Sequence, residues 1–280
     1  MDADARRGYV ELARPTNTVV AGVLTFVGAF VAGGAFTRPV LVGAAVLATW
    51  LATAGGNAIN DYFDRDIDRI NAPDRPIPRG AVSVRGALIY SGVLFAGAVG
   101  FALLLPPLAI AIAAVDLVAL IAYTRVFKGL PGAGNAVVAF LGGSTFLFGA
   151  ATVGDVRAGA VLFVLAALST FTREVIKDIE DVAGDRAEGL RTLPIAVGER
   201  SAHVVAGIVL VVAVAASPLP YVWGIFGWPY LVVVVPANLV MLGGCAVAWP
   251  DPSRGQQILK YGMFLAAMAF VVGRLAVVLG

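Results

Sequence analysis

Asn57-Ala-Ile-Asn-Asp-Tyr-Phe-Asp-Arg-Asp-Ile-Asp68 is an acidic stretch whose pattern returns later in the chain, at Asp178-Ile-Glu-Asp-Val-Ala-Gly-Asp185. Both stretches contain Asp-x-x-Asp-x-x-x-Asp, and at about 100° of rotation per helical residue the three aspartates of each fall within an arc of roughly 60°. Carboxylates that share one helix face repel each other unless a cation neutralises them. Each stretch therefore predicts an acidic helix face that needs a cation. We name the two trios the first acidic motif (Asp61, Asp64 and Asp68) and the second acidic motif (Asp178, Asp181 and Asp185).

The composition is that of an integral membrane protein. Hydrophobic residues make up 59% of the 280 positions, charged residues make up 14%, and the mean hydropathy is +0.88, whereas a soluble domain carries about 25% charged residues. We expect a single membrane domain over 1–280, because no polar block is long enough for a soluble domain. The one cysteine, Cys245, offers neither a disulfide nor a cysteine-based metal site. Residues 1–15 lack the pattern of a signal peptide.

Apolar runs recur along the chain, each near the roughly 20 residues that a membrane-spanning helix needs. They predict an all-α fold of about nine transmembrane helices. The runs are rich in Gly, Ala and Val, which suits close contact between helices in lipid because small residues let the backbones approach. The predicted spans are 16–36, 39–60, 84–105, 107–126, 133–152, 157–176, 201–220, 229–249 and 257–279.

The basic residues are distributed unevenly between the two sets of predicted span ends. Of the 20 Lys and Arg residues, only Arg38, Arg157 and Arg274 fall on one side. The positive-inside rule makes the other side cytoplasmic. That side carries the N-terminus and both acidic motifs, so we predict a multi-pass protein of the cell membrane with a cytoplasmic cap of Asp-rich loops.

The segments that follow the two motifs also resemble each other. Asp74-Arg75-Pro-Ile-Pro78-Arg79-Gly80 follows the first motif, and Gly189-Leu-Arg191-Thr-Leu-Pro194-Ile follows the second. Each contains an Arg-x-[Ile/Leu]-Pro turn. The repetition predicts a pseudo-duplicated bundle with halves of roughly 1–132 and 133–280.

The residue types suit diphosphate chemistry. Mg²⁺ is typically held by one or two carboxylates plus substrate phosphates, and guanidinium groups bind phosphate oxygens in a bidentate manner. We therefore predict that the two acidic faces, flanked by Arg75, Arg79 and Arg191, meet around Mg²⁺ and a diphosphate. A metal-bound diphosphate is a good leaving group, because the cation stabilises the charge that builds on it as the C–O bond breaks. An allylic carbocation left behind needs a dry pocket and an aromatic face, for which the candidates are Phe63, Tyr123, Phe146 and Phe148.

From Arg14-Pro15-Thr16-Asn17 to the ninth predicted span, these features resemble the UbiA-type intramembrane prenyltransferases. The second motif, within Arg173-Glu-Val-Ile-Lys177-Asp178 and onward to Thr192-Leu-Pro194, is most similar to that of the archaeal digeranylgeranylglyceryl phosphate synthases. The first motif fits the chlorophyll synthase branch nearly as well. The resemblance implies nine helices around a central cavity and a Mg²⁺-dependent transfer of a geranylgeranyl group from geranylgeranyl diphosphate. The implied acceptor is the free hydroxyl of geranylgeranylglyceryl phosphate, which gives an archaeal ether lipid precursor.

The resemblance also implies roles for individual residues. Metal binding and catalysis fall to the six aspartates of the two motifs. Many family members have a Tyr and a Lys four residues apart after the fourth span; here Tyr123 and Lys128 are five apart, which leaves their role open. The residues expected to bind the substrates are Asn17, Asn57, Asn60, Arg75, Arg79, Tyr123, Lys128, Lys177 and Arg191. The expected partners are a prenyl diphosphate, a lipid-like acceptor and membrane lipid, with no nucleic acid and no obligate protein partner.

Several alternatives stay open at this point. The same chemistry could serve an aromatic or chlorin acceptor, as in a quinone or chlorophyll synthase. A secondary transporter is a more remote alternative, since transporter sites usually lie near the membrane midplane on broken helices. Asp116, an acid within the fourth span, is either functional or hydrogen-bonded to a neighbouring helix. Asn135 either caps the fifth helix or lines the cavity.

Overall fold

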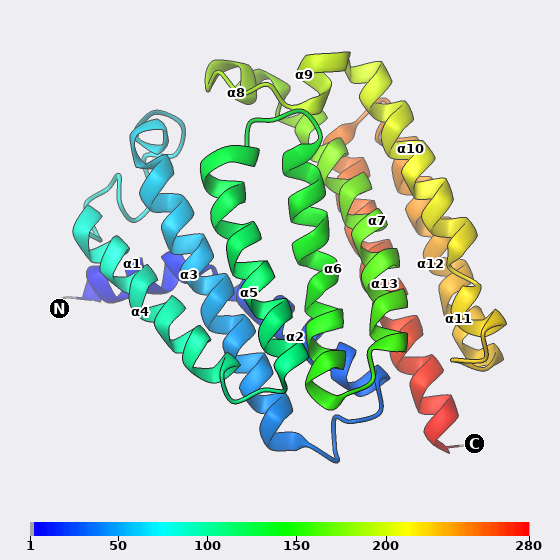
Figure 1. Cartoon of the computed structure of the whole chain (residues 1–280). Helices are drawn as coiled ribbons and strands as arrows, with labels where there is room; N and C mark the ends of the chain where they lie inside the picture. Colours follow the sequence, from blue (N-terminus) through cyan, green and yellow to red (C-terminus); the bar gives the residue numbers. More distant parts are fainter. Residues whose placement is uncertain (1–2, 280) are drawn as a thin grey trace.

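Long apolar helices run side by side through the computed structural model, which describes residues 3–279 (Figure 1). Within these residues there is no strand, and eight helices are long and apolar enough to cross a membrane. They are α3 (Pro39–Asn71), α4 (Val84–Ala102), α5 (Pro107–Ala122) continued by the π-helix η1 (Tyr123–Phe127), α6 (Ala133–Val153), α7 (Val156–Glu180), α10 (Glu199–Ala216) continued by α11 (Leu219–Val222), α12 (Trp228–Val247) and α13 (Pro252–Leu279).

The predicted all-α membrane fold is thus confirmed for the described residues. The first predicted span corresponds to α2 (Pro15–Val31), which is apolar but has only 17 residues. At 1.5 Å per residue it extends about 26 Å, slightly less than the roughly 30 Å hydrocarbon core of a bilayer. Nine as the number of spans therefore stays a prediction. Met1, Asp2 and Gly280, which the predicted domain includes, lie outside the described residues.

Both acidic motifs lie at the same end of the bundle. The C-terminal end of α3, the connection between η1 and α6, and the short helices α8 (Val182–Ala187) and α9 (Leu193–Val197) all occupy the upper end of the view in Figure 1. The bundle therefore brings together chain segments that are more than a hundred residues apart in sequence.

An N-terminal helix, α1 (Ala3–Ala13), is packed beside the first motif. Its residue Leu12 is fully buried in a small apolar cluster with Ala58 of α3, with Ile77 and Val82 of the following loop, and with Ala87 of α4. This packing fixes the junction between α1 and α2 against the acidic end of α3.

Small residues allow α2 and α6 to pack backbone against backbone, as the Gly-rich composition predicts. A Cβ atom added to Gly149 of α6 would lie 2.0 Å from the carbonyl oxygen of Thr25, and one added to Gly28 of α2 would lie 2.2 Å from that of Phe146.

Gly149→Val should therefore push the two helices apart and destabilise the fold by roughly 1–3 kcal/mol or more. Thermal unfolding in detergent measures this effect. Gly92→Val on α4, where an added Cβ meets open space, serves as the control; an equal loss in both variants would contradict the packing argument.

Candidate active site

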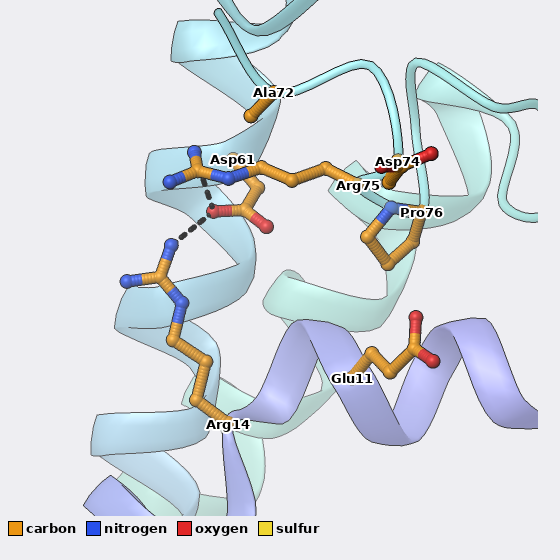
Figure 2. Close-up of a pocket in the computed structure, with 7 residues that line it drawn as sticks. All are labelled: Glu11, Arg14, Asp61, Ala72, Asp74, Arg75 and Pro76. Carbon is orange, nitrogen blue, oxygen red and sulfur yellow. Dashed lines mark hydrogen bonds and ion pairs between the residues drawn. The ribbon is translucent and has the colours of Figure 1, made fainter.

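The first acidic motif lies on the last turns of α3, which continues to Asn71, beyond the end of the predicted span. Asp61 and Asp68 are buried, with 4% and 5% of their surface exposed. The Asp61 Oδ1 atom accepts a hydrogen bond of 2.5 Å from Nη2 of Arg14 and lies 3.7 Å from Nη1 of Arg75. The same Arg75 nitrogen donates to Asp68 Oδ2 at 2.6 Å (Figure 2 shows the Asp61 side of this arrangement). Two buried carboxylates of the motif thus share one guanidinium.

The π-helix η1 brings Lys128 to the third carboxylate. The backbone N–H of Lys128 donates to the carbonyl of Tyr123 at 2.9 Å, a bond across five residues instead of four. A turn of this width places residues five apart on the same side, which accounts for the unusual Tyr123–Lys128 spacing; such turns are frequent at functional sites. Lys128 Nζ then donates to Asp64 Oδ2 at 2.6 Å. On the same turn, the Thr124 hydroxyl donates to Asn60 Oδ1 at 2.7 Å.

The second acidic motif does not form one continuous helix face, so that part of the prediction is wrong. The helix α7 ends at Glu180, Asp181 lies between α7 and α8, and Asp185 belongs to α8. The backbone nevertheless stays close to helical, because Asp185 N–H donates to the carbonyl of Asp181 at 2.9 Å. Asp185 therefore stays one helical turn from Asp181, although it belongs to a separate helix.

Each end of the second motif has a polar partner. Asn135 of α6 donates from Nδ2 to Asp178 Oδ2 at 2.8 Å, and the Thr192 hydroxyl donates to Asp185 Oδ2 at 3.0 Å. Burial raises the pKa of the Asp185 carboxyl; the Thr192 hydrogen bond opposes this rise, while the charges of Asp181 and Glu188 add to it. A carboxylate in this environment gains stability when a cation binds nearby.

Several observations show that the two acidic segments converge. Tyr123 lies near enough to Asp64 of the first motif, and to Asp178 and Asp185 of the second, for their charges to act on its side chain. Beside them, the Asn71 side chain at the end of α3 donates to Glu188 Oε1 at 3.2 Å. The loops are tied together as well, since the backbone N–H of Arg191 donates to the carbonyl of Gly129 at 3.2 Å. Tyr123 therefore lies between the two acidic segments, and Lys128 lies on the Asp64 side of this space.

Some predicted substrate-binding residues are directed elsewhere. Asn57 donates to the carbonyl of Ala13 at 3.1 Å and so fixes the end of α1. Arg79 binds Glu11 on α1 and the carbonyl of Asp74, both at 2.7 Å, and not an acid of either motif. Asn17 and Arg191 are exposed at the surface, and within residues 3–279 no side-chain hydrogen bond or ion pair ties them to the motifs. Lys177 is also exposed and makes no such bond, but its charge acts on Asp178 and Asp185 of the second motif.

Of the aromatic residues predicted to stabilise a carbocation, some lie in the helix core and one lines a pocket. Phe146 and Phe148 are buried in the packed helix core. Phe63 instead lines an apolar pocket of about 370 Å³ together with Ile59, Leu88, Phe95 and Leu120, and the guanidinium of Arg125 lies 5.0 Å from the centre of its ring. Thr124 also lines this pocket, so space for a hydrocarbon chain lies directly beside Asn60 and the first motif.

The structure also shows the partners of two residues whose roles the sequence left open. The side chain of Asn135 binds Asp178 and makes no cap, because α6 begins after Gly132. Asp116 on α5 accepts a hydrogen bond of 2.9 Å from Ser144 on α6, which is the interhelical contact considered for it. The sequence reading missed Arg14 as a partner of the motif. Arg14 is distinguished in the structure by its left-handed backbone, with φ of 47°. No other non-glycine residue within 3–279 has a positive φ.

The metal-binding groups do not form a closed cage. Among residues 3–279, no group of three or more His, Cys, Asp or Glu side chains is arranged to hold a metal by itself. The groups that gather are carboxylates, whose oxygens are the ligands that Mg²⁺ prefers, and one or two suffice when substrate phosphates supply further oxygens. Asp64 is partly accessible and Asp181 is exposed. The donor set fits a magnesium ion that is shared with a phosphate group.

The sequence and the fold are matched by known proteins. The UbiA prenyltransferase family matches residues 21–268. The chain belongs to this family. It is therefore a membrane-embedded prenyltransferase, and the transporter alternative is wrong.

Similar proteins of this family cover nearly the whole chain. The digeranylgeranylglyceryl phosphate synthase of Halobacterium salinarum is 66% identical over 269 residues, which are 96% of this chain and 98% of the relative. The enzyme of the same name from Natronomonas pharaonis is 65% identical over 97% of this chain and 98% of the relative.

Solved structures share the fold. A structure described for digeranylgeranylglyceryl phosphate synthase superposes with a TM-score of 0.85 at 31% identity, over 96% of this chain and 98% of the other. A UbiA homologue from Archaeoglobus fulgidus bound to GPP and Mg²⁺ has a TM-score of 0.71 at 20% identity, over 97% of this chain and 99% of the other.

Proposed function

We propose that the protein transfers a geranylgeranyl group from geranylgeranyl diphosphate to the free hydroxyl of geranylgeranylglyceryl phosphate, and that the reaction needs Mg²⁺. The observation that carries the reaction type is the convergence of the two acidic segments around Tyr123, beside the ion pair of Lys128 with Asp64. The acceptor is supported by the relatives named digeranylgeranylglyceryl phosphate synthase, which match this chain at 65–66% identity over almost its full length.

The carboxylates of Asp64 and Asp68 in the first motif, and of Asp181 and Asp185 in the second, would hold the metal. When bound, Mg²⁺ neutralises the charge that builds on the diphosphate as its C–O bond breaks. The UbiA homologue from Archaeoglobus fulgidus, with the same fold, is bound to GPP and Mg²⁺, which supports this assignment.

The chain's own residues supply the rest of the mechanism. Lys128, held by Asp64 at 2.6 Å, carries a positive charge to the place where the leaving group forms. The apolar pocket beside Asn60 accommodates an isoprenoid chain and keeps water from the allylic carbon. The C–O bond between the allylic carbon and the diphosphate breaks, and the diphosphate leaves. The hydroxyl oxygen of the lipid acceptor forms the new ether bond to that carbon, and the hydroxyl proton passes to an oxygen that can accept it in the site.

The purified protein in lipid or detergent provides the test. Incubation with geranylgeranyl diphosphate, geranylgeranylglyceryl phosphate and Mg²⁺ should yield the doubly alkylated glycerol phosphate, detected by mass spectrometry together with released diphosphate. Parallel reactions with a hydroxybenzoate and with a chlorin acceptor test the alternatives. Prenylation of either of these without any doubly alkylated lipid would reject the glycerol phosphate acceptor.

We further propose that both motifs face the cytoplasm, as the distribution of Lys and Arg indicates. Ala187 on α8 is exposed at the motif end, and Thr37, between α2 and α3, is exposed at the opposite end. In a Cys245→Ser background, Thr37→Cys should react with a membrane-impermeant thiol reagent in intact cells, whereas Ala187→Cys should react only after permeabilisation. The reverse labelling pattern would place the site outside.

A further inference from the structure

A pocket of about 410 Å³ opens beside the first motif. Its lining comes from Glu11 of α1, Arg14 at the α1–α2 junction, Asp61 of α3 and the loop 72–76 that follows α3 (Figure 2). Every lining residue belongs to the first half of the chain. No residue of the second acidic motif lines this pocket, so its lining differs from that of the space between the motifs, where the diphosphate site is proposed.

The position of Arg14 is fixed by several contacts. Its backbone adopts the left-handed conformation, with φ of 47° and ψ of 71°, immediately before Pro15, and such a backbone is unfavourable for a side chain of this size. The junction is held because the Ala13 carbonyl accepts hydrogen bonds from Asn57 at 3.1 Å and from the Thr18 hydroxyl at 2.8 Å. The result is a guanidinium aimed at the buried Asp61 carboxylate.

Both arginines keep donors free for a ligand. A guanidinium has five N–H donors. Within residues 3–279, the ion pairs of Arg14 use only Nη2, on Asp61, and those of Arg75 use only Nη1, on Asp61 and Asp68. The side chains remain 37% and 39% exposed. In Figure 2 the two guanidinium groups flank the Asp61 carboxylate, so their remaining N–H groups can bind one anion together.

The acidic residues of the lining do not prevent anion binding. Asp61 is compensated by the two arginines. Glu11 is paired with Arg79 at 2.7 Å and with Arg7 at 2.8 Å. Only Asp74, which is exposed, has no such compensation and opposes an anion through solvent-screened repulsion.

We infer that Arg14 and Arg75, held in place by Asp61, bind the phosphate group of the lipid acceptor. This inference rests on the proposed function, because it takes the acceptor to be a glycerol phosphomonoester. Guanidinium forks match the oxygens of such a group. The location also fits, because any hydroxyl of a three-carbon glycerol lies within two carbons of the phosphate ester. Arg75 joins the pocket to Asp68, so a phosphate bound here leaves the hydroxyl next to the proposed diphosphate site.

Arg14→Asn tests the inference. Asn tolerates the left-handed backbone well, so the junction should keep its shape while the guanidinium is lost. Losing a charge-assisted hydrogen-bond pair should raise KM for geranylgeranylglyceryl phosphate by roughly 10- to 100-fold. KM for geranylgeranyl diphosphate should stay within about twofold. Turnover of the dephosphorylated acceptor, geranylgeranylglycerol, should not change, so that the preference for the phosphorylated acceptor collapses.

Two further variants complete the design. Arg6→Gln removes a positive charge from the exposed face of α1 and should leave both KM values unchanged. Asp74→Asn should lower KM for the phosphorylated acceptor by about two- to threefold, an improvement that a folding defect cannot produce.

The outcomes are distinguishable. A rise in KM for the prenyl diphosphate in Arg14→Asn, or an equal loss with both acceptors, would overturn the phosphate subsite while leaving the proposed function intact. Failure of the unmodified protein to alkylate either acceptor would instead reject the proposed function.

Discussion

Asp64→Asn is expected to lower the rate of prenyl transfer by roughly a hundred- to a thousand-fold, an effect comparable to the loss of one group that stabilises developing charge in other active sites. Asp64 is the most accessible carboxylate of the first motif, and it holds Lys128 at 2.6 Å. Asn keeps the size of the side chain and removes its charge, so both the proposed metal ligand and the anchor of Lys128 are lost. Steady-state turnover of geranylgeranyl diphosphate measures the loss of rate, and thermal unfolding measured in parallel shows whether the variant is folded.

Asp66→Asn provides a matched control for this variant. Asp66 lies two residues further along α3, about 200° around the helix, where its side chain is 66% exposed and pairs with Arg69. The control should keep nearly the full rate. A rate close to that of the unmodified protein in Asp64→Asn would remove this residue from the site, and the same comparison applies to Asp181→Asn on the second motif.

Removal of divalent cations is expected to abolish the reaction almost completely. No carboxylate cluster within residues 3–279 is closed by protein groups alone, so the metal should be held jointly by protein and substrate and should be easily extracted. Activity should fall below detection in EDTA and return on addition of Mg²⁺ in excess. Rates measured over a range of free Mg²⁺ concentrations check this.

A variant separates the role of the metal from a general effect of salt. In Asp181→Asn, any residual activity should require a higher Mg²⁺ concentration for half-maximal rate, whereas Asp66→Asn should behave like the unmodified protein. Full activity in EDTA would contradict a metal-dependent mechanism and would leave the charge on the leaving group to cationic side chains such as Lys128.

Much of the architecture could be predicted because lipid imposes simple rules on sequence. The apolar runs gave the helices of the bundle, and the charge pattern marked the acidic end of α3. The break at Asp181 was not predictable in the same way, since Asp-x-x-Asp-x-x-x-Asp suits a continuous helix equally well, and the spacing does not reveal where α7 ends.

The partners of the motifs were harder to predict than the motifs themselves. Arg14 contacts Asp61 across 47 positions of sequence, and Asn135 contacts Asp178 across 43. Such pairs depend on how helices pack, which local spacing does not encode. Arg79 shows the converse case: it was predicted to bind phosphate because it follows the first motif, and in the structure it pairs with Glu11 of α1. Its role in substrate binding stays a prediction.

The widened turn at Tyr123–Phe127 has a consequence for comparing this protein with its relatives. The hydrogen bond from the Lys128 N–H to the Tyr123 carbonyl makes this turn one residue wider than an α-helical turn. An alignment that counts four positions from Tyr123 would assign the role of Lys128 to Phe127. In this region, the role of a residue should be transferred between relatives by superposing the structures and not by counting positions along the sequence.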